Sequence, residues 1–168
     1  NKWMEEVDDS TYFKKTAANI YEKIGENEKA EKLFSEYLKE KPEDQFAYKE
    51  KIKLKLENKA PEKAVEELKN ILSIAKRDKN PHLHTLLAEK LEKIDEYEEA
   101  VKEYEKTLEL DPDNKFALKQ AGFTLYKLKN YEKALPYLKE VFRNDPGDYY
   151  TRSVLMNIFK ELNKEKEG

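Results

Sequence analysis

One short phrase, a glutamate followed two residues later by an alanine, occurs four times along the chain at nearly constant spacing. Consecutive alanines are 34, 36 and 34 residues apart, at Ala30, Ala64, Ala100 and Ala134. A proline follows three of these alanines by twelve residues, at Pro42, Pro112 and Pro146. Because two independent markers share one period, the chain is built from repeats of about 34 residues.

Each repeat has the pattern of two helices. Apolar residues follow each alanine at four, seven and eight residues, the spacing of one helical face, as in Phe34, Tyr37 and Leu38. A second stripe precedes the alanine, and short polar turns such as 25–27 separate the two stripes. The spacing predicts an all-α chain without strands, with helices near 11–24, 27–41, 44–57, 61–76, 82–93, 97–110, 115–128, 131–144 and 149–163.

Composition excludes several classes of protein. With 41% charged and 38% hydrophobic residues, the bulk composition leans towards disorder. The order of the apolar residues along the chain therefore decides whether the chain is expected to fold. The absence of cysteine excludes disulfides and thiolate sites and slightly favours a reducing, cytoplasmic location. No apolar run is long enough to span a membrane, and a net charge of −3 opposes nucleic-acid binding. The lysine bias fits a thermophilic source or an AT-rich coding sequence equally well.

The repeats resemble the tetratricopeptide repeat, a helix–turn–helix unit of 34 residues. Residues 81–114 and 115–148 match its pattern closely, residues 11–44 also match, and the degenerate repeat 45–80 matches only in its second helix. The resemblance implies one domain over residues 1–168, an α-solenoid of stacked antiparallel hairpins that form a right-handed superhelix. Four repeats are followed by a capping helix and tail, 149–168.

The same resemblance gives the small residues a steric role, because two helices that cross closely need a small residue at the contact. The positions concerned are Ala18, Ala30, Ala64, Ala88, Ala100, Gly122 and Ala134. In the last helix we expect four apolar residues to face inward, Leu155, Met156, Phe159 and Leu162, with a frayed tail from Asn163. Residues 1–10, with Trp3, Met4 and Val7, are predicted to end a preceding repeat, which indicates a piece of a longer protein.

Motifs for catalysis, metal or cofactor binding are not predicted. The histidines, His82 and His84, point to opposite sides of a helix at this spacing, so we interpret them as surface residues rather than metal ligands. The four glycines form no phosphate-binding loop, and 36 acidic residues on solvated helices carry no catalytic information. We therefore expect no enzyme.

One known binding mode of the family is predicted to be absent. Residues 4–8 read Met-Glu-Glu-Val-Asp, the C-terminal pentapeptide of a cytosolic heat-shock chaperone that some tetratricopeptide domains bind, but here it is internal and is interpreted as coincidence. Lys15 and Asn19 occupy two slots of the matching carboxylate clamp. Glu50 stands where that clamp has asparagine, and His82 and Leu86 replace its lysine and arginine.

By resemblance, the first helix of each repeat turns one face towards a groove that binds a peptide or helix of another protein. The groove residues predicted in this way are Lys15, Asn19, Lys49, Lys53, His82, Leu86, Phe116, Lys119, Gln120, Phe123, Tyr150 and Asn157. The aromatics at 116, 123 and 150 favour an anchoring site in the C-terminal half, and Lys15, Lys49 and Lys53 favour steering of an acidic segment. The alternative is an architectural segment of a larger or self-associating scaffold.

Overall fold

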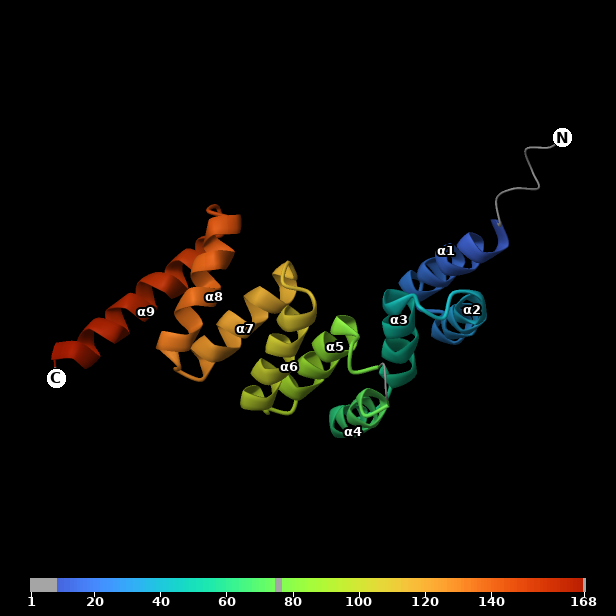
Figure 1. Ribbon diagram of the computed structural model, residues 1–168, viewed down its shortest axis with the longest axis horizontal. Coiled ribbons are helices and arrows are strands. Elements are labelled where there is room, and N and C mark those ends of the chain that lie inside the picture. The colour runs from blue at the N-terminus through green and yellow to red at the C-terminus, as the bar shows by residue number, and fades with distance from the viewer. Residues whose placement is uncertain (1–8, 75–76, 168) are drawn as a thin grey trace. The chain divides into compact units, whose positions relative to one another are not determined.

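The computed structural model describes residues 9–74 and 77–167, and all regular structure in these two stretches is α-helical (Figure 1). The helices are α1 (Asp9–Lys23), α2 (Asn27–Glu40), α3 (Gln45–Leu56), α4 (Pro61–Leu72), α5 (Pro81–Glu92), α6 (Tyr97–Leu110), α7 (Lys115–Lys127), α8 (Tyr131–Asn144) and α9 (Tyr149–Glu167). This confirms the all-α helical repeat fold. The expected preceding helix and the pentapeptide at 4–8 lie outside the described residues.

Side-chain caps explain where the first helices of the repeats begin. Asp44 accepts a hydrogen bond from the backbone N–H of Ala47 at 2.8 Å, and Asn114 accepts one from that of Ala117 at 2.9 Å. Asn80 and Asp148 cap α5 and α9 in the same way. Each cap satisfies an amide that the first turn of a helix leaves without a partner.

The turns of the α1–α2, α5–α6 and α7–α8 hairpins share one unusual backbone conformation. Gly25, Asp95 and Lys129 stand at equivalent places between the two helices of a hairpin and have φ values of 80°, 61° and 59°. Glycine adopts this left-handed conformation without steric cost, whereas the other two residues carry a side chain there. The polar turns predicted from sequence are therefore left-handed corners that close the hairpins.

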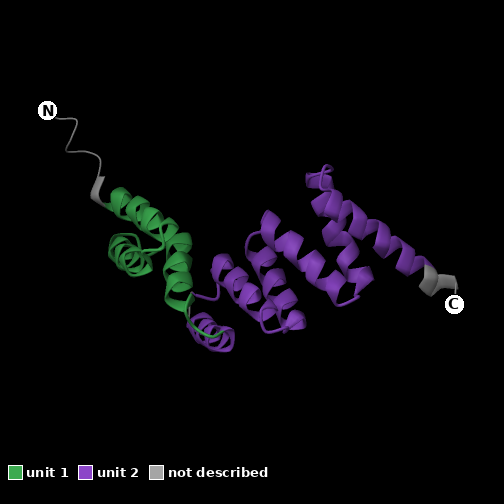
Figure 2. Ribbon diagram, turned by 180° about the vertical axis from the view of Figure 1, so that it is seen from behind, with its two compact units in different colours: residues 1–60 green, residues 61–168 purple. Residues whose placement is uncertain are grey.

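The described chain divides into two compact units, residues 1–60 and 61–168 (Figure 2). In the first unit, α1 and α2 pair as a hairpin and α3 packs on α2 around Phe34 and Leu54. In the second unit, α5–α6 and α7–α8 form hairpins, α4 packs on α5, and α9 packs on α8 around Leu138 and Ile158. The repeat boundaries, the assignment of 1–168 to one domain and the right-handed superhelix stay predictions.

The small residues are buried as predicted. Their alanines, Ala18, Ala30, Ala64, Ala88, Ala100 and Ala134, are all 0% exposed. At Gly122 a built Cβ atom would lie 2.8 Å from Cδ2 of Leu138, which is closer than ordinary van der Waals contact. The α7–α8 crossing therefore has no room for a larger residue at this position.

Several details differ from the sequence-based expectations. Helix α4 ends at Leu72 rather than near 76, and α9 continues as helix to Glu167 instead of fraying from Asn163. In α9, Met156 and Phe159 are 65% and 44% exposed, whereas Ile158 is completely buried. The predicted inward face of α9 was wrong at Met156 and Phe159, because α9 packs on α8 through the face of Leu155 and Ile158.

Candidate functional site

Three of the predicted groove residues line one cavity in the second unit. Its volume is about 500 Å³, and its walls come from the end of α5, from α7 and from the start of α9. Its lining residues are Glu92, Gln120, Phe123, Thr124, Tyr126, Lys127 and Tyr150. We call this set the aromatic cavity.

Two aromatic rings that are tilted against each other line the aromatic cavity. The centroids of Phe123 and Tyr150 are 5.0 Å apart, with an angle of 39° between the ring planes. Tyr150 is 64% exposed, whereas Phe123 is half-buried and packs against the core of the second unit. The phenylalanine thus supports a tyrosine that remains largely open to a partner.

The polar side of the cavity is held in place by hydrogen bonds. The Glu92 carboxylate accepts one from the Thr124 hydroxyl at 2.7 Å and one from the Tyr104 hydroxyl at 2.9 Å. Burial and the neighbouring Glu92 carboxylate raise the pKa of Tyr104, which stays protonated as a donor. Glu92 therefore links α5, α6 and α7 at the edge of the cavity.

Lys119 borders this region but is engaged within the chain. Its Nζ lies 5.8 Å from the Phe123 ring centroid and donates to Asp148 Oδ2 at 2.8 Å. That hydrogen bond, together with those from Thr151, lowers the pKa of the Asp148 carboxyl to about 2. Because Asp148 also caps α9, Lys119 fixes the start of that helix.

The other two predicted residues of the C-terminal half, Phe116 and Asn157, are not in the lining of the aromatic cavity. Phe116 is 47% exposed and meets Tyr104 edge to face, with ring centroids 6.5 Å apart. The Asn157 amide donates to the Tyr126 hydroxyl at 2.6 Å, so it orients a residue that lines the cavity.

Lys15 and Asn19 line a separate cavity of about 480 Å³ within the first unit. Lys15 donates to Asp44 at 2.6 Å, and its Nζ lies 5.5 Å from the ring centroid of Tyr37. Asp44 caps α3 as Asp148 caps α9. The lysine–aspartate pair, 29 residues apart in both cases, is thus a repeated structural contact.

Lys49 and Lys53 are paired with carboxylates as well. Lys53 lies 2.6 Å from Glu22 and 3.3 Å from Glu50, and Lys49 pairs with Glu50. Glu50 is only 5% exposed, and although burial favours its neutral form, the two ammonium groups hold its pKa below the usual value. The charges expected to steer an acidic segment are therefore compensated locally.

The predictions for α5 need correction. Leu86 is 3% exposed and is therefore not accessible to a partner. His82 is half-buried near the start of α5, but His84 is 4% exposed, so its interpretation as a surface residue was wrong. Helix α5 packs on both α4 and α6. Residues on more than one side of the helix are therefore buried, whereas the sequence-based prediction assigned a single buried stripe.

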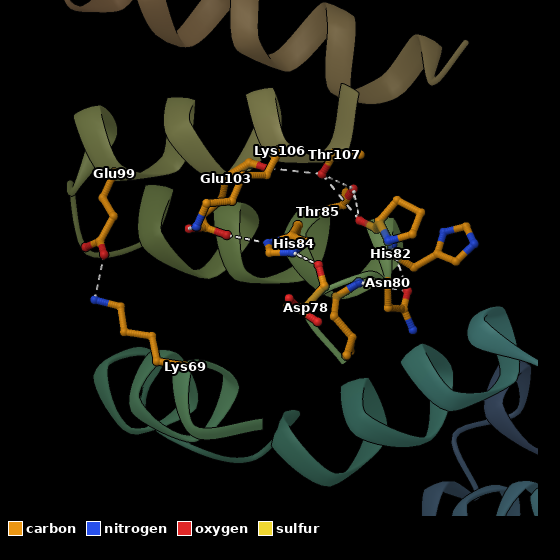
Figure 3. A network of polar contacts seen from close by, with 12 residues as sticks. Lys69, Asp78, Asn80, His82, His84, Thr85, Glu99, Glu103, Lys106 and Thr107 are labelled. Atoms are coloured by element: carbon orange, nitrogen blue, oxygen red, sulfur yellow. Dashed lines mark hydrogen bonds and ion pairs between the residues drawn. The ribbon is translucent and has the colours of Figure 1, made fainter. Parts of the chain in front are cut away.

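His84 is the centre of a buried polar network that sequence analysis missed (Figure 3). Its Nδ1 lies 2.6 Å from Glu103 Oε2 and its Nε2 lies 2.7 Å from the carbonyl oxygen of Asp78. Lys106 donates to the other carboxylate oxygen of Glu103 at 2.7 Å. Two acceptors facing one imidazole favour the doubly protonated ring.

The network shifts the pKa values of His84 and Glu103. Burial opposes the charge of His84, but the hydrogen bonds to Glu103 and Asp78 raise its pKa above the ordinary value. Burial likewise opposes ionisation of Glu103, but the hydrogen bonds from His84 and Lys106 lower its pKa. The network therefore holds an ionised pair between α5 and α6 and ties the α4–α5 loop to it.

We expect the thermal midpoint to fall as the pH rises from about 6.5 through the raised folded-state pKa of His84. Over that range the folded chain binds more protons than the unfolded chain, so its free energy of unfolding decreases with pH. Glu103 acts in the opposite direction. Its contribution is complete above its ordinary pKa and is lost as the pH falls through its lowered folded-state value.

Circular dichroism melts between about pH 5 and pH 9 measure this dependence. His84→Gln should remove the part of the slope that lies above neutral pH. An unchanged slope in that variant would mean that His84 is not the titrating group.

Two stretches of the chain, residues 81–114 and 120–148, match the sequence model of the tetratricopeptide repeat. These two stretches are tetratricopeptide repeats. The prediction from sequence is thereby confirmed, on the two repeats that also show the closest fit to the pattern.

Solved structures of other tetratricopeptide repeat proteins share the fold. MamA from Desulfovibrio magneticus RS-1 (residues 41 to the end) is 26% identical, with a TM-score of 0.59 over 70% of this chain and 66% of that one. PilF of Pseudomonas aeruginosa is 19% identical, with a TM-score of 0.67 over 95% and 71%. A further MamA structure is 16% identical, with a TM-score of 0.65 over 87% and 84%.

Tetratricopeptide repeats serve as protein-interaction or scaffold modules and are generally non-catalytic. Within residues 9–74 and 77–167, no cluster of three or more histidine, aspartate or glutamate side chains has the arrangement of a metal site. None of the described helices has the length and hydropathy needed to cross a bilayer.

Proposed function

We propose that the second unit binds a peptide or short helix of another protein at the aromatic cavity. The observation that carries the proposal is the exposed ring of Tyr150, supported by Phe123 beside a cavity of about 500 Å³. Aromatic side chains supply a large contact area at a low cost in conformational entropy and are enriched among residues that dominate binding.

The surroundings of the cavity are suited to holding a partner in one orientation. Gln120 contributes an amide that can both donate and accept hydrogen bonds, and Lys127 contributes a cation whose ammonium also donates to the Tyr97 hydroxyl. The cavity walls are fixed by the Glu92 hydrogen bonds and by the Asn157–Tyr126 contact. Because these groups are already ordered, little side-chain entropy is lost when a partner binds.

Tyr150→Ala is expected to weaken binding by about 1–2 kcal/mol, close to tenfold in Kd, and to leave the fold intact because the ring is largely exposed. Phe123→Ala should weaken binding by a similar amount and also lower stability, since Phe123 packs against the core. The measurement is a fluorescence-anisotropy titration with a peptide selected on the wild-type protein from a displayed library.

Tyr149→Ala is the matched control for this experiment. Tyr149 is adjacent in sequence and 81% exposed, but it does not line the aromatic cavity. Equal affinity of the wild type and Tyr150→Ala, or equal losses at Tyr149 and Tyr150, would place the binding site elsewhere.

An architectural role is the second candidate function. It is favoured by the ion pairs of Lys15, Lys49, Lys53 and Lys119, all predicted groove residues whose charges are used to join helices within the chain. A segment that only connects neighbouring parts of a scaffold would need such internal contacts and no open cavity. Recovery of no peptide with measurable affinity for the wild-type protein would support this role.

A further inference from the structure

One carboxylate in the lining of the aromatic cavity is held by uncharged donors. Glu92 accepts from the hydroxyls of Thr124 and Tyr104, one on each carboxylate oxygen. Because both donors are neutral, these two hydrogen bonds fix the half-buried carboxylate without balancing its charge. A carboxylate oxygen has two lone pairs, so each oxygen of Glu92 keeps a second one for a further donor.

The Gln120 side chain is oriented by the same hydrogen-bond chain. It bonds to the hydroxyl of Tyr104, which is completely buried. The single proton of that hydroxyl is directed at Glu92, so the amide nitrogen of Gln120 must be the donor. The carbonyl oxygen of Gln120 therefore remains as an acceptor. Since Gln120 and Glu92 both line the cavity, this side of it offers acceptors to a ligand.

The equivalent carboxylate in the first unit is paired with a lysine. Glu22 precedes Glu92 by 70 residues, which is the length of the two repeat spacings of 34 and 36. The Lys53 ammonium lies 2.6 Å from the carboxylate of Glu22. The residue 70 positions after Lys53 is Phe123, whose ring lines the aromatic cavity. Where the first unit holds a lysine beside the carboxylate, the second unit therefore has an aromatic ring.

The lysines near the cavity are engaged with other groups. The Lys127 ammonium donates to the hydroxyl of Tyr97 at 2.5 Å and lies 4.0 Å from the centroid of its ring. The hydrogen bond to Tyr97 raises the pKa of Lys127 most, and the charge of Glu92 contributes least. Lys119, next to Phe123, is held by Asp148. Neither lysine therefore balances Glu92 in the way that a direct ion pair does.

We propose that the aromatic cavity binds an arginine side chain of the partner peptide, whose guanidinium group packs against Phe123 and Tyr150 and donates to Glu92 and Gln120. This inference rests on the proposed function and specifies the chemistry of the partner. A guanidinium group has five N–H donors and no acceptor, which matches the acceptors on this side of the cavity. Its charge takes the place that the Lys53 ammonium has in the first unit.

The shape of the cavity favours arginine over lysine. The rings of Phe123 and Tyr150 are 5.0 Å apart and tilted by 39°, and a planar guanidinium group packs well against aromatic faces. The two oxygens of Glu92, each with a lone pair left, match the parallel N–H groups of a guanidinium fork. A lysine ammonium is compact and strongly hydrated, so it gains less from the rings and cannot bond to both oxygens in this planar way.

The probes are the peptides selected on the wild-type chain whose affinity falls in Tyr150→Ala. We expect them to contain an arginine. Replacing this arginine by citrulline, which has the same shape but no charge, should lower the affinity at least about tenfold in an anisotropy titration. Lysine at the same peptide position should also bind more weakly than arginine.

Glu92→Gln tests the protein side of the contact. It should weaken the arginine peptide at least about tenfold and the citrulline peptide much less, because only the arginine loses a charged acceptor. Glu96→Gln is the matched control. It makes the same chemical change at an exposed carboxylate that does not line the aromatic cavity, and it should leave binding unchanged.

The possible failures are distinguishable. Peptides that depend on Tyr150 but lack an arginine, or bind equally well with citrulline, would overturn this inference and leave the proposed function intact. Recovery of no peptide that depends on Tyr150 would overturn both. Equal losses in Glu92→Gln and Glu96→Gln would reduce the effect to net charge and overturn the contact with Glu92. Equal losses of the arginine and citrulline peptides in Glu92→Gln would do the same, and circular dichroism establishes that each variant is folded.

Discussion

Glu103→Ala is expected to lower the free energy of unfolding by about 3–5 kcal/mol, because it leaves the charged His84 buried without its counterion. The carboxylate is 5% exposed and accepts from both His84 and Lys106. Loss of its oxygens removes the acceptor of the His84 Nδ1 proton, so the buried imidazole loses either that hydrogen bond or its charge. Urea unfolding followed by circular dichroism measures the change.

Glu99→Ala is the matched control, since Glu99 lies one helical turn away on α6 and is also ion-paired. Glu99 and its partner Lys69, 2.8 Å away, are 40% and 46% exposed. Exposed pairs contribute about 0–1 kcal/mol, so this variant should stay close to the wild type. If the two substitutions lowered the free energy of unfolding by similar amounts, burial would not strengthen the His84–Glu103 pair.

The reason that this network escaped prediction is geometric. The spacing of His82 and His84 correctly separates the two side chains, but it does not say which of them faces the protein interior. That depends on the packing of α5 against both α4 and α6, which also buried Leu86. Tertiary packing on two sides overrides a single-stripe assignment made from sequence.

The candidate site was predictable where it follows the repeat register. Gln120 and Phe123 share a face of α7, and Tyr150 begins the next first helix, so the period alone brings them to one surface. The partners of the lysines are set by contacts between helices and could not be derived from one helix at a time. One signal was present: a lysine stands 29 residues before an aspartate cap both at Lys15–Asp44 and at Lys119–Asp148.

Several helix boundaries were predicted to the residue, both with a side-chain cap and, in α6, without one. Helices α6 and α8 have the predicted bounds, and α7 begins where predicted, next to the Asn114 cap. Helix α4 was predicted too long because apolar residues continue past Leu72. Ile74 is 58% exposed, however, and its N–H bonds to the carbonyl of Ile71 in a tighter turn.

Gly122→Leu is expected to lower the free energy of unfolding by about 1–3 kcal/mol, although leucine favours helix more than glycine does. A Cβ atom at this position would lie 2.9 Å from Cγ of Leu138 and 3.1 Å from Cβ of Tyr137. Leu138 is itself 0% exposed and cannot move aside without disturbing the core between α7, α8 and α9. Ala100→Leu should have a similar effect, because Ala100, at another predicted close-packing position, is completely buried in α6.

Two further variants separate overpacking from helix propensity. In Gly122→Ala the gain in propensity, about 1 kcal/mol, opposes a clash of one methyl group, so its effect should be much smaller than that of Gly122→Leu. Met156 occupies the Gly122 register in α9 but is 65% exposed, so Met156→Leu should change stability by less than about 0.5 kcal/mol. Thermal melts of the four variants measure the series. If Gly122→Leu and Ala100→Leu both kept the wild-type midpoint, the small residues would not mark the helix crossings and the repeat register would be wrong.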